Sequence, residues 1–184
     1  RRHDAPGVRD PGWALDLGQE AATWAPSNHY TWAVIGLALD ELGDWPRAQA
    51  VFWYARRRFP YNPKAHHQLG HALAMRGMVD EGEAVYRQAI RRFPDNEFCW
   101  SDLAQTLRVA GRLEEAVSVY REAQSSFHKN HVIANGLAGT LIDLGRKDEA
   151  SEALDWAERV LPDDAKSQTL FRDMKNRLVA LQDG

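Results

Sequence analysis

Three histidines lie close together in the sequence, at His66, His67 and His71. His67 and His71 are four residues apart, a spacing that places both imidazoles on one face of a helix. Zinc is bound by imidazoles in this way, but a protein zinc site needs at least a third ligand. The sequence has no H-E-x-x-H pattern and no third ligand at the same spacing. We therefore predict no metal and no cofactor here. His66 is interpreted as a packing residue, and His67 and His71 as polar surface residues.

The single cysteine, Cys99, is the other residue with reactive chemistry. A nucleophilic thiol needs a basic partner that stabilises the thiolate. Its neighbours Trp100 and Asp102 supply none. We therefore interpret Cys99 as a small, semi-buried thiol, and we predict no catalytic residue and no enzyme activity. A lone cysteine forms no intrachain disulfide, which fits a reducing compartment such as the cytoplasm.

Two clusters of arginine, at 56–58 and 91–92, could in principle bind phosphate groups. The formal net charge is −3 and the isoelectric point is near 6.2, which argues against nucleic acid and anionic membranes as partners. Both clusters fall where a helix is expected to end, and cations interact favourably with that end of the helix dipole. We predict solvated charge, no nucleic-acid partner and, with no run of about 18 apolar residues, no membrane insertion.

A sequence repeat predicts the helices on which these residues lie. Glycines recur at one constant interval, at Gly43, Gly77, Gly111 and Gly145. A leucine precedes each glycine by four residues, at Leu39, Leu73, Leu107 and Leu141. An alanine follows each by twelve, at Ala55, Ala89, Ala123 and Ala157. A fixed period of about 34 residues predicts stacked units that share one continuous core.

Each period reads as two helices of roughly 14 residues on either side of the glycine. Small residues such as Gly36 let helix backbones approach, and large ones such as Phe52 fill the space beside them. We predict four full units, at 29–62, 63–96, 97–130 and 131–164. An N-terminal tail and half repeat precede them at 1–28, with a helix at about 10–25. A C-terminal capping helix follows at 165–184, with an apolar stripe of Leu170, Phe171, Met174, Leu178 and Leu181 and with Arg172, Asp173, Lys175, Asn176 and Arg177 facing away.

These units resemble the tetratricopeptide repeat (TPR), whose pattern is W-x2-L-G-x2-Y, then A-x3-F-x2-A, then P. The first unit carries it as Trp32, Ile35, Gly36, Leu39, Ala48, Phe52, Ala55 and Pro60. His66 and Ala134 replace the first Trp in later units, and His128 replaces one Pro. The resemblance implies an all-α, superhelical solenoid of helix-turn-helix units. Because the chain opens at Arg1 without a methionine, we expect it to be a fragment of a larger protein.

The resemblance also implies a function. The first helix of each TPR unit lines a concave groove that binds a protein segment, so we predict a non-catalytic protein–protein interaction scaffold. The mixture of groove residues suits an extended or helical peptide with an acidic or polar centre and one or two apolar anchors. The candidate groove residues are Tyr30, Leu37, Lys64, His67, His71, Phe98, Ser101, Gln105, Arg108 and Asn135.

Two alternatives stay open. The array could be the regulatory or docking arm of a multidomain enzyme, or of a polysaccharide-export or secretion machine. It could also self-associate, because Trp13, Leu17 and Trp24 lie on a half repeat that has no partner helix in the sequence. A cationic clamp for a C-terminal carboxylate, which some TPR domains carry, has no counterpart at the matching positions of this chain.

Overall fold

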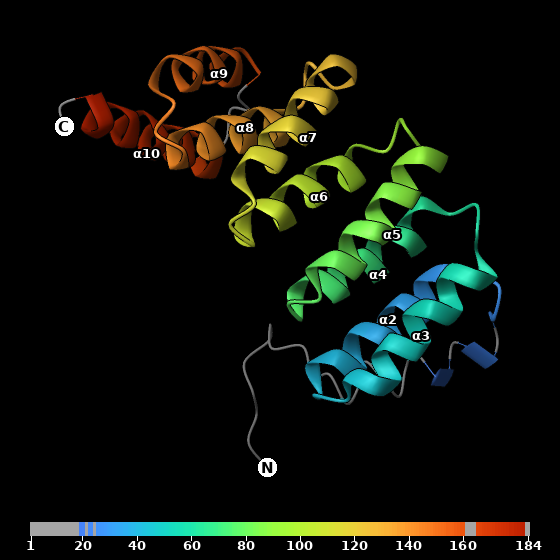
Figure 1. Ribbon diagram of the computed structural model, residues 1–184. Coiled ribbons are helices and arrows are strands. Elements are labelled where there is room, and N and C mark those ends of the chain that lie inside the picture. The colour runs from blue at the N-terminus through green and yellow to red at the C-terminus, as the bar shows by residue number, and fades with distance from the viewer. Residues whose placement is uncertain (1–18, 21, 24, 161–164, 183–184) are drawn as a thin grey trace. The chain divides into compact units, whose positions relative to one another are not determined.

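The computed structural model describes residues 19–20, 22–23, 25–160 and 165–182, and the regular secondary structure of that part is all α-helix (Figure 1). It divides into two compact units, residues 1–72 and 73–184, which are described separately below. The predicted tail and most of the predicted half repeat, up to residue 18, lie outside the described residues. The described part of that half repeat is helical at 19–20 and 22–23.

Helices follow one another along the chain with short turns between them. The first unit contains α2 (His29–Glu41), α3 (Trp45–Arg58) and most of α4 (Pro63–Met75). The second contains α5 (Val79–Arg92), α6 (Glu97–Val109), α7 (Leu113–Ser126), α8 (His131–Asp143), α9 (Lys147–Arg159) and α10 (Ala165–Gln182). α2 packs on α3 in the first unit. In the second unit α6 packs on α7 and α8 on α9, α5 contacts α6, α7 contacts α8, and α10 contacts both α8 and α9.

A left-handed turn joins the two helices of each pair. The four repeat glycines have φ angles of 80°, 74°, 78° and 70°, in the region that a residue with a Cβ rarely adopts. The amide of Asp44, just after Gly43, donates to the carbonyl of Leu39 at 2.8 Å, and Arg112 donates likewise to Leu107 at 2.9 Å. This is the Schellman ending, which satisfies carbonyls that the helix leaves unpaired.

Asparagine side chains begin the first helix of each pair. Asn28 Oδ1 accepts a hydrogen bond from the Tyr30 amide at 3.0 Å, and Asn130 Oδ1 accepts from the amide of Val132 at 2.9 Å. Asn62 and Asn96 act in the same way. Such caps satisfy amides that have no partner inside the helix. The four asparagines also recur at the interval of the glycines, so the start of each pair is specified by the repeat as its turn is.

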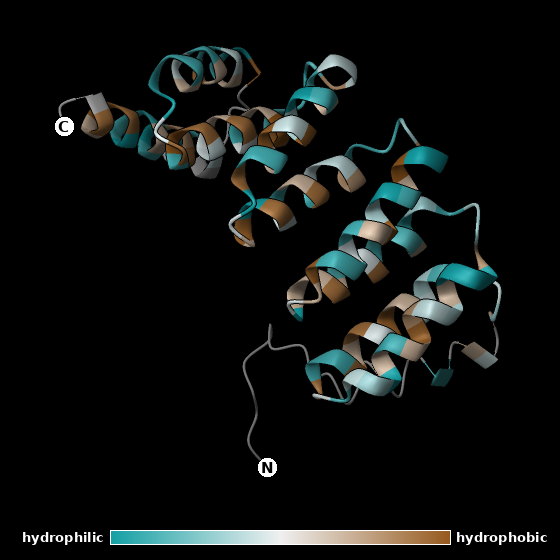
Figure 2. Cartoon of the chain, in the orientation of Figure 1, coloured by the Kyte–Doolittle hydropathy of each residue, from teal (hydrophilic) through white to brown (hydrophobic). Residues whose placement is uncertain are grey.

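Small residues allow close packing, as the sequence predicts. A Cβ at Gly36 would lie 2.6 Å from the ring of Phe52, and one at Gly136 would lie 2.3 Å from the ring of Tyr120. Side chains larger than hydrogen therefore do not fit at either position without movement of the aromatic ring. α8 buries most of its length and is coloured largely as hydrophobic in Figure 2.

In two units an indole N–H donates to a carbonyl of the turn that precedes the helix pair. Trp32 Nε1 donates to the carbonyl of Pro26 at 2.9 Å, and Trp100 Nε1 donates to that of Pro94 at 3.0 Å. In both cases the carbonyl belongs to the residue six positions earlier. Each of these prolines lies in the turn before a helix, so its carbonyl has no partner within a helix and the indole N–H satisfies it.

Two units lack this tryptophan, and in each a different side chain contacts the equivalent carbonyl. His66 is buried, and its Nε2 lies 3.3 Å from the carbonyl oxygen of Pro60, which confirms it as a packing residue. Ala134 has no polar atom to offer. There Trp156 of α9 donates its indole N–H to the carbonyl of His128 at 2.8 Å. The carbonyl is thus satisfied from a different helix.

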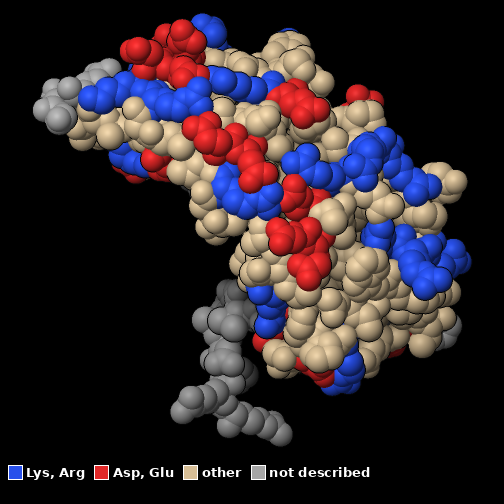
Figure 3. Space-filling view, in the orientation of Figure 1, with Lys and Arg blue, Asp and Glu red and all other residues tan. Residues whose placement is uncertain are grey.

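Charged side chains outside the core also follow the repeat. Arg112 contacts Asp80 at 3.3 Å and Glu115 at 2.6 Å. The same arrangement recurs one repeat later with Arg146, Glu114 and Glu149. On the face shown in Figure 3, Lys and Arg side chains are interspersed with Asp and Glu. Exposed pairs of this kind each contribute about 0–1 kcal/mol. None of the described helices is long and apolar enough to span a lipid bilayer.

Two glycines of α8 provide a test of this packing. Gly136→Ala is expected to lower the free energy of unfolding by about 1–3 kcal/mol, because the new methyl group would overlap the buried Tyr120 ring. Gly139→Ala is the matched control: its Cβ meets only the guanidinium of Arg108, at 3.3 Å, and alanine favours a helix by up to about 1 kcal/mol. Urea denaturation measures both, and equal effects of the two changes would contradict the packing argument.

The substitute tryptophan provides a second test. Trp156→Phe is expected to cost about 1–3 kcal/mol, since it leaves the carbonyl of His128 without its donor. Trp53→Phe is the control because its side chain is 40% exposed, and we expect a change within about 0.5 kcal/mol. Thermal unfolding followed by circular dichroism compares the two. A Trp156 variant as stable as the Trp53 variant would refute the proposed compensation.

Candidate functional site

The predicted groove residues fall in both units. Tyr30 and Leu37 lie on α2, and Lys64, His67 and His71 lie on α4, all in the first unit. The second unit carries the rest, with Asn135 on α8 and with Phe98, Ser101, Gln105 and Arg108 on α6. The structure brings residues of each set together within their own unit.

In the first unit, α2 and α4 present aromatic, apolar and basic groups. Lys64 Nζ contacts the hydroxyl of Tyr30 and lies 4.8 Å from the centre of its ring. Leu37 follows Tyr30 by seven residues, close to two helical turns, and both side chains are about half exposed. The rings of His67 and His71 are nearly parallel, with centres 6.2 Å apart. No group of three or more metal-ligating side chains occurs among the described residues.

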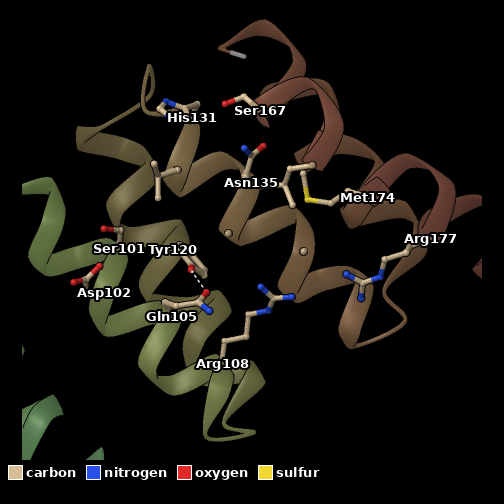
Figure 4. A pocket seen from close by; sticks show the side chains of 14 residues that line it. Ser101, Asp102, Gln105, Arg108, Tyr120, His131, Asn135, Ser167, Met174 and Arg177 are labelled. Carbon is tan, nitrogen blue, oxygen red and sulfur yellow. Dashed lines mark hydrogen bonds between the residues drawn. The ribbon is translucent and has the colours of Figure 1, made fainter. Parts of the chain in front are cut away.

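In the second unit, a pocket of about 530 Å³ opens between α6, α8 and α10 (Figure 4). Four predicted residues line it: Ser101, Gln105, Arg108 and Asn135. Phe98 is not among the lining residues and is 57% exposed near the start of α6. The other lining residues are Asp102, Tyr120, His131, Val132, Gly136, Gly139, Ser167, Leu170, Met174 and Arg177.

Asn135 is the polar residue most deeply set in this pocket's lining on α8. Its side chain is 9% exposed, and its Oδ1 accepts no hydrogen bond from the described part of the chain. Figure 4 shows its carboxamide directed into the pocket. Thr140, one turn further along α8, is by contrast satisfied, since its hydroxyl donates to the carbonyl of Gly136 at 2.6 Å. Leaving a buried acceptor unpaired costs about 1–3 kcal/mol.

Two arginines meet at the other end of the pocket. Arg108 Nε and Nη2 each lie 2.7 Å from Oδ2 of Asp143, and Arg177 contacts the second oxygen of the same carboxylate. The nearest atoms to a Cβ built at Gly139 are those of the Arg108 guanidinium, so the missing side chain leaves room for it. The shared carboxylate holds both cations in place.

The prediction that Arg177 faces away from the array is wrong. α10 begins one repeat period after α8 and packs on α8 and α9, as the first helix of a further unit would. Arg177 therefore lies beside Asp143, from which it is separated by the same period. The predicted stripe is otherwise confirmed for Phe171, Met174 and Leu178, which are buried, whereas Leu170 is 49% exposed and lines the pocket. The constant interval between the helix starts was the sequence signal for this role.

Two further groups have strongly shifted proton affinities. The phenol of Tyr120, which comes from α7, is buried; burial raises its pKa, with Arg108 opposing and Asp102 adding to the effect. It stays neutral and donates to Gln105 Oε1 at 3.5 Å. Cys99 is fully buried, and burial together with Asp102 raises the pKa of its thiol to about 12. The thiol is more deeply buried than predicted and is held in its unreactive form.

Family models for the tetratricopeptide repeat match residues 63–106 and 107–172. The chain belongs to the tetratricopeptide repeat family. TPR proteins are generally non-catalytic scaffolds for protein–protein interaction, so the fold implies a protein partner in general terms. No curated protein matches the chain significantly.

Solved structures agree with this assignment. A thermophilic TPR protein of Thermus thermophilus superposes with a TM-score of 0.69 at 18% identity, over 89% of this chain and 90% of that one. MamA of Desulfovibrio magneticus RS-1 gives 0.60 at 21% identity, over 82% and 83%. A chain of the APC/C hetero-tetramer Cut9-Hcn1 gives 0.67 at 15% identity, over 94% of this chain and 37% of that one. The predicted all-α TPR fold is confirmed.

The state of Cys99 can be checked directly. With a pKa of about 12, roughly one thiol in 10⁴ is ionised at pH 8, and the buried sulfur is also shielded from reagents. Alkylation by iodoacetamide is therefore expected to be at least about 100-fold slower in the native chain than in guanidinium chloride. Mass spectrometry of timed samples measures both rates, and comparable rates would contradict the buried, protonated thiol.

Proposed function

We propose that this TPR array is a non-catalytic scaffold whose α6–α8–α10 pocket binds an extended segment of a partner protein. The observation that carries the proposal is that Asn135 lines the pocket, while its Oδ1 is buried and accepts no hydrogen bond from the described residues. An extended peptide offers a backbone N–H at every residue, and is thus a suitable donor for such an acceptor.

The remainder of the pocket supports a peptide as its ligand. Val132 and Leu170 are each about half exposed and line the pocket with the buried Met174, so an apolar side chain of the partner would cover surface that is otherwise in contact with water. The volume lies in the range of sites that enclose small ligands, which suits one or two side chains of a longer segment. Specificity would come from the polar groups around this apolar centre.

The first unit supplies a second proposed contact surface, made of Tyr30, Leu37, Lys64, His67 and His71. Its exposed Tyr30 and Leu37 would bind an apolar residue of a partner protein, with Lys64 beside Tyr30. In this proposal the repeating units are 29–62, 63–96, 97–130 and 131–164, and 165–184 is a capping helix that also contributes to the pocket. The alternatives of a docking arm within a larger enzyme and of self-association stay predictions.

Replacing Asn135 by leucine separates binding from stability. Asn135→Leu keeps a similar side-chain volume and removes the unpaired acceptor, so the free energy of unfolding is expected to stay the same or to rise by about 1–3 kcal/mol. Peptide affinity is expected to fall by about 10-fold or more, because the partner's N–H group loses its acceptor. The probes are twelve-residue peptides selected from a random display library on the wild-type chain, and fluorescence anisotropy measures their affinity.

Asn176→Leu is the matched control, because Asn176 is exposed on α10 and does not line the pocket. It should bind the selected peptides as the wild type does. Equal affinity for all three proteins would place the peptide site elsewhere. Failure to select any peptide would argue against a groove-binding scaffold.

A further inference from the structure

We infer that the α6–α8–α10 pocket selects partner segments in which an acidic side chain lies two residues from an apolar one, with the acidic group at Arg108 and Arg177. This inference rests on the proposed function, because it specifies the chemistry of the segment that the pocket binds. The acidic group is a side chain within the segment. The arrangement of charge along the pocket supports this inference.

The pocket has two chemically different ends. α6 contributes Ser101, Gln105 and Arg108 at helical spacing, and α10 contributes Ser167, Met174 and Arg177 in the same order. In Figure 4, His131 and Ser167 lie at one end, while Arg108 and Arg177 lie toward the other, with Asn135 between them. A segment that lies along the pocket therefore meets hydroxyl and imidazole groups first and guanidinium groups last.

The end of the pocket at Arg108 and Arg177 can bind an additional anion. Two guanidinium groups share the single carboxylate of Asp143, which leaves a local excess of one positive charge. Each guanidinium has five N–H donors, and the contacts to Asp143 occupy two from Arg108 and one from Arg177. Their side chains are 25% and 48% exposed, so a ligand carboxylate could be bound without displacing Asp143. Asp143 is then a positioning residue that holds both arginines.

A carboxylate on α6 disfavours an acidic group on the side of the pocket away from the arginines. The carboxyl group of Asp102 lines the pocket beside Ser101, and its charge is felt by the buried Tyr120. An acidic side chain placed there would face like charge, whereas at Arg108 and Arg177 it meets opposite charge. The charge arrangement therefore fixes which end of the pocket receives the acidic residue.

The spacing in the segment follows from α10. Met174 and Arg177 are three residues apart, a rise of about 4.5 Å along the helix. Alternate residues of an extended chain project to the same side and are about 6.6 Å apart, whereas adjacent residues project to opposite sides. An apolar side chain on Leu170 and Met174 thus places the residue two positions away near the arginines.

The test uses the full 184-residue chain and three display libraries of twelve-residue peptides. Their central cores are Leu-x-Glu, Leu-x-Gln and Leu-x-Lys, and their flanks are random. Panned as an equal mixture, the wild-type chain is expected to recover Leu-x-Glu clones at least about 10-fold more often than Leu-x-Gln clones, with Leu-x-Lys clones the rarest. Raising the salt concentration from about 0.05 M to about 0.5 M should reduce this excess, because the attraction is screened.

In Arg108→Gln/Arg177→Gln the excess of Leu-x-Glu is expected to fall below about twofold. Arg121→Gln/Arg172→Gln is the matched control: it removes the same charge from two exposed arginines that do not line the pocket, and the excess should persist. Thermal unfolding verifies that both variants fold. If the first does not, Arg108→Lys/Arg177→Lys retains the charge and should keep a preference for Glu over Gln.

Equal recovery of the three libraries, with binding still lost in Asn135→Leu, would overturn the acidic preference and leave the proposed function intact. An excess of Leu-x-Glu that survives high salt, or that is lost equally in the control variant, would also overturn it. Recovery of no peptide from any library would reject the proposed function itself.

Discussion

The left-handed turn at the repeat glycines is the constraint on which the remaining contacts depend. Each turn ends one helix and begins the next within a few residues, so successive pairs keep a constant length. The effect is visible in contacts between pairs. Lys64 meets Tyr30, and Arg177 meets Asp143, each across one full repeat of sequence. A turn of different length in one pair would displace the side chains of that pair from their partners in the neighbouring pairs.

The indole contacts show what the packing requires at the junction between pairs. The carbonyl six residues before the first large packing position needs a donor, and Trp32 and Trp100 supply it from that position itself. His66 supplies a smaller ring, while Trp156 reaches the same kind of carbonyl from α9. The requirement is thus for an N–H group at a point in space, which the fold can meet from more than one position in the sequence.

Local features were predictable from sequence, and features set by tertiary packing were less so. The glycine turns, the helices around them and the buried role of His66 follow from local patterns and the repeat. Four of the ten predicted groove residues line one pocket, since helical spacing places them on one face of α6 and α8. The orientation of Arg177 was missed because it depends on where α10 packs. That Asn135 Oδ1 is buried without a partner depends on the atoms around it, which no single-sequence pattern specifies.

The pocket arises from the same missing side chains that allow the helices to pack. Gly136 lets the ring of Tyr120 approach α8, and Gly139 leaves space for the guanidinium of Arg108. Larger residues at these positions would meet the Tyr120 ring and the Arg108 guanidinium. Elsewhere on α8 a buried polar group such as Thr140 is satisfied within its own helix. A polar side chain that folding buries and leaves unpaired, beside two arginines held by one aspartate, lowers stability slightly unless a ligand completes it. The proposed binding of a partner segment would account for that combination.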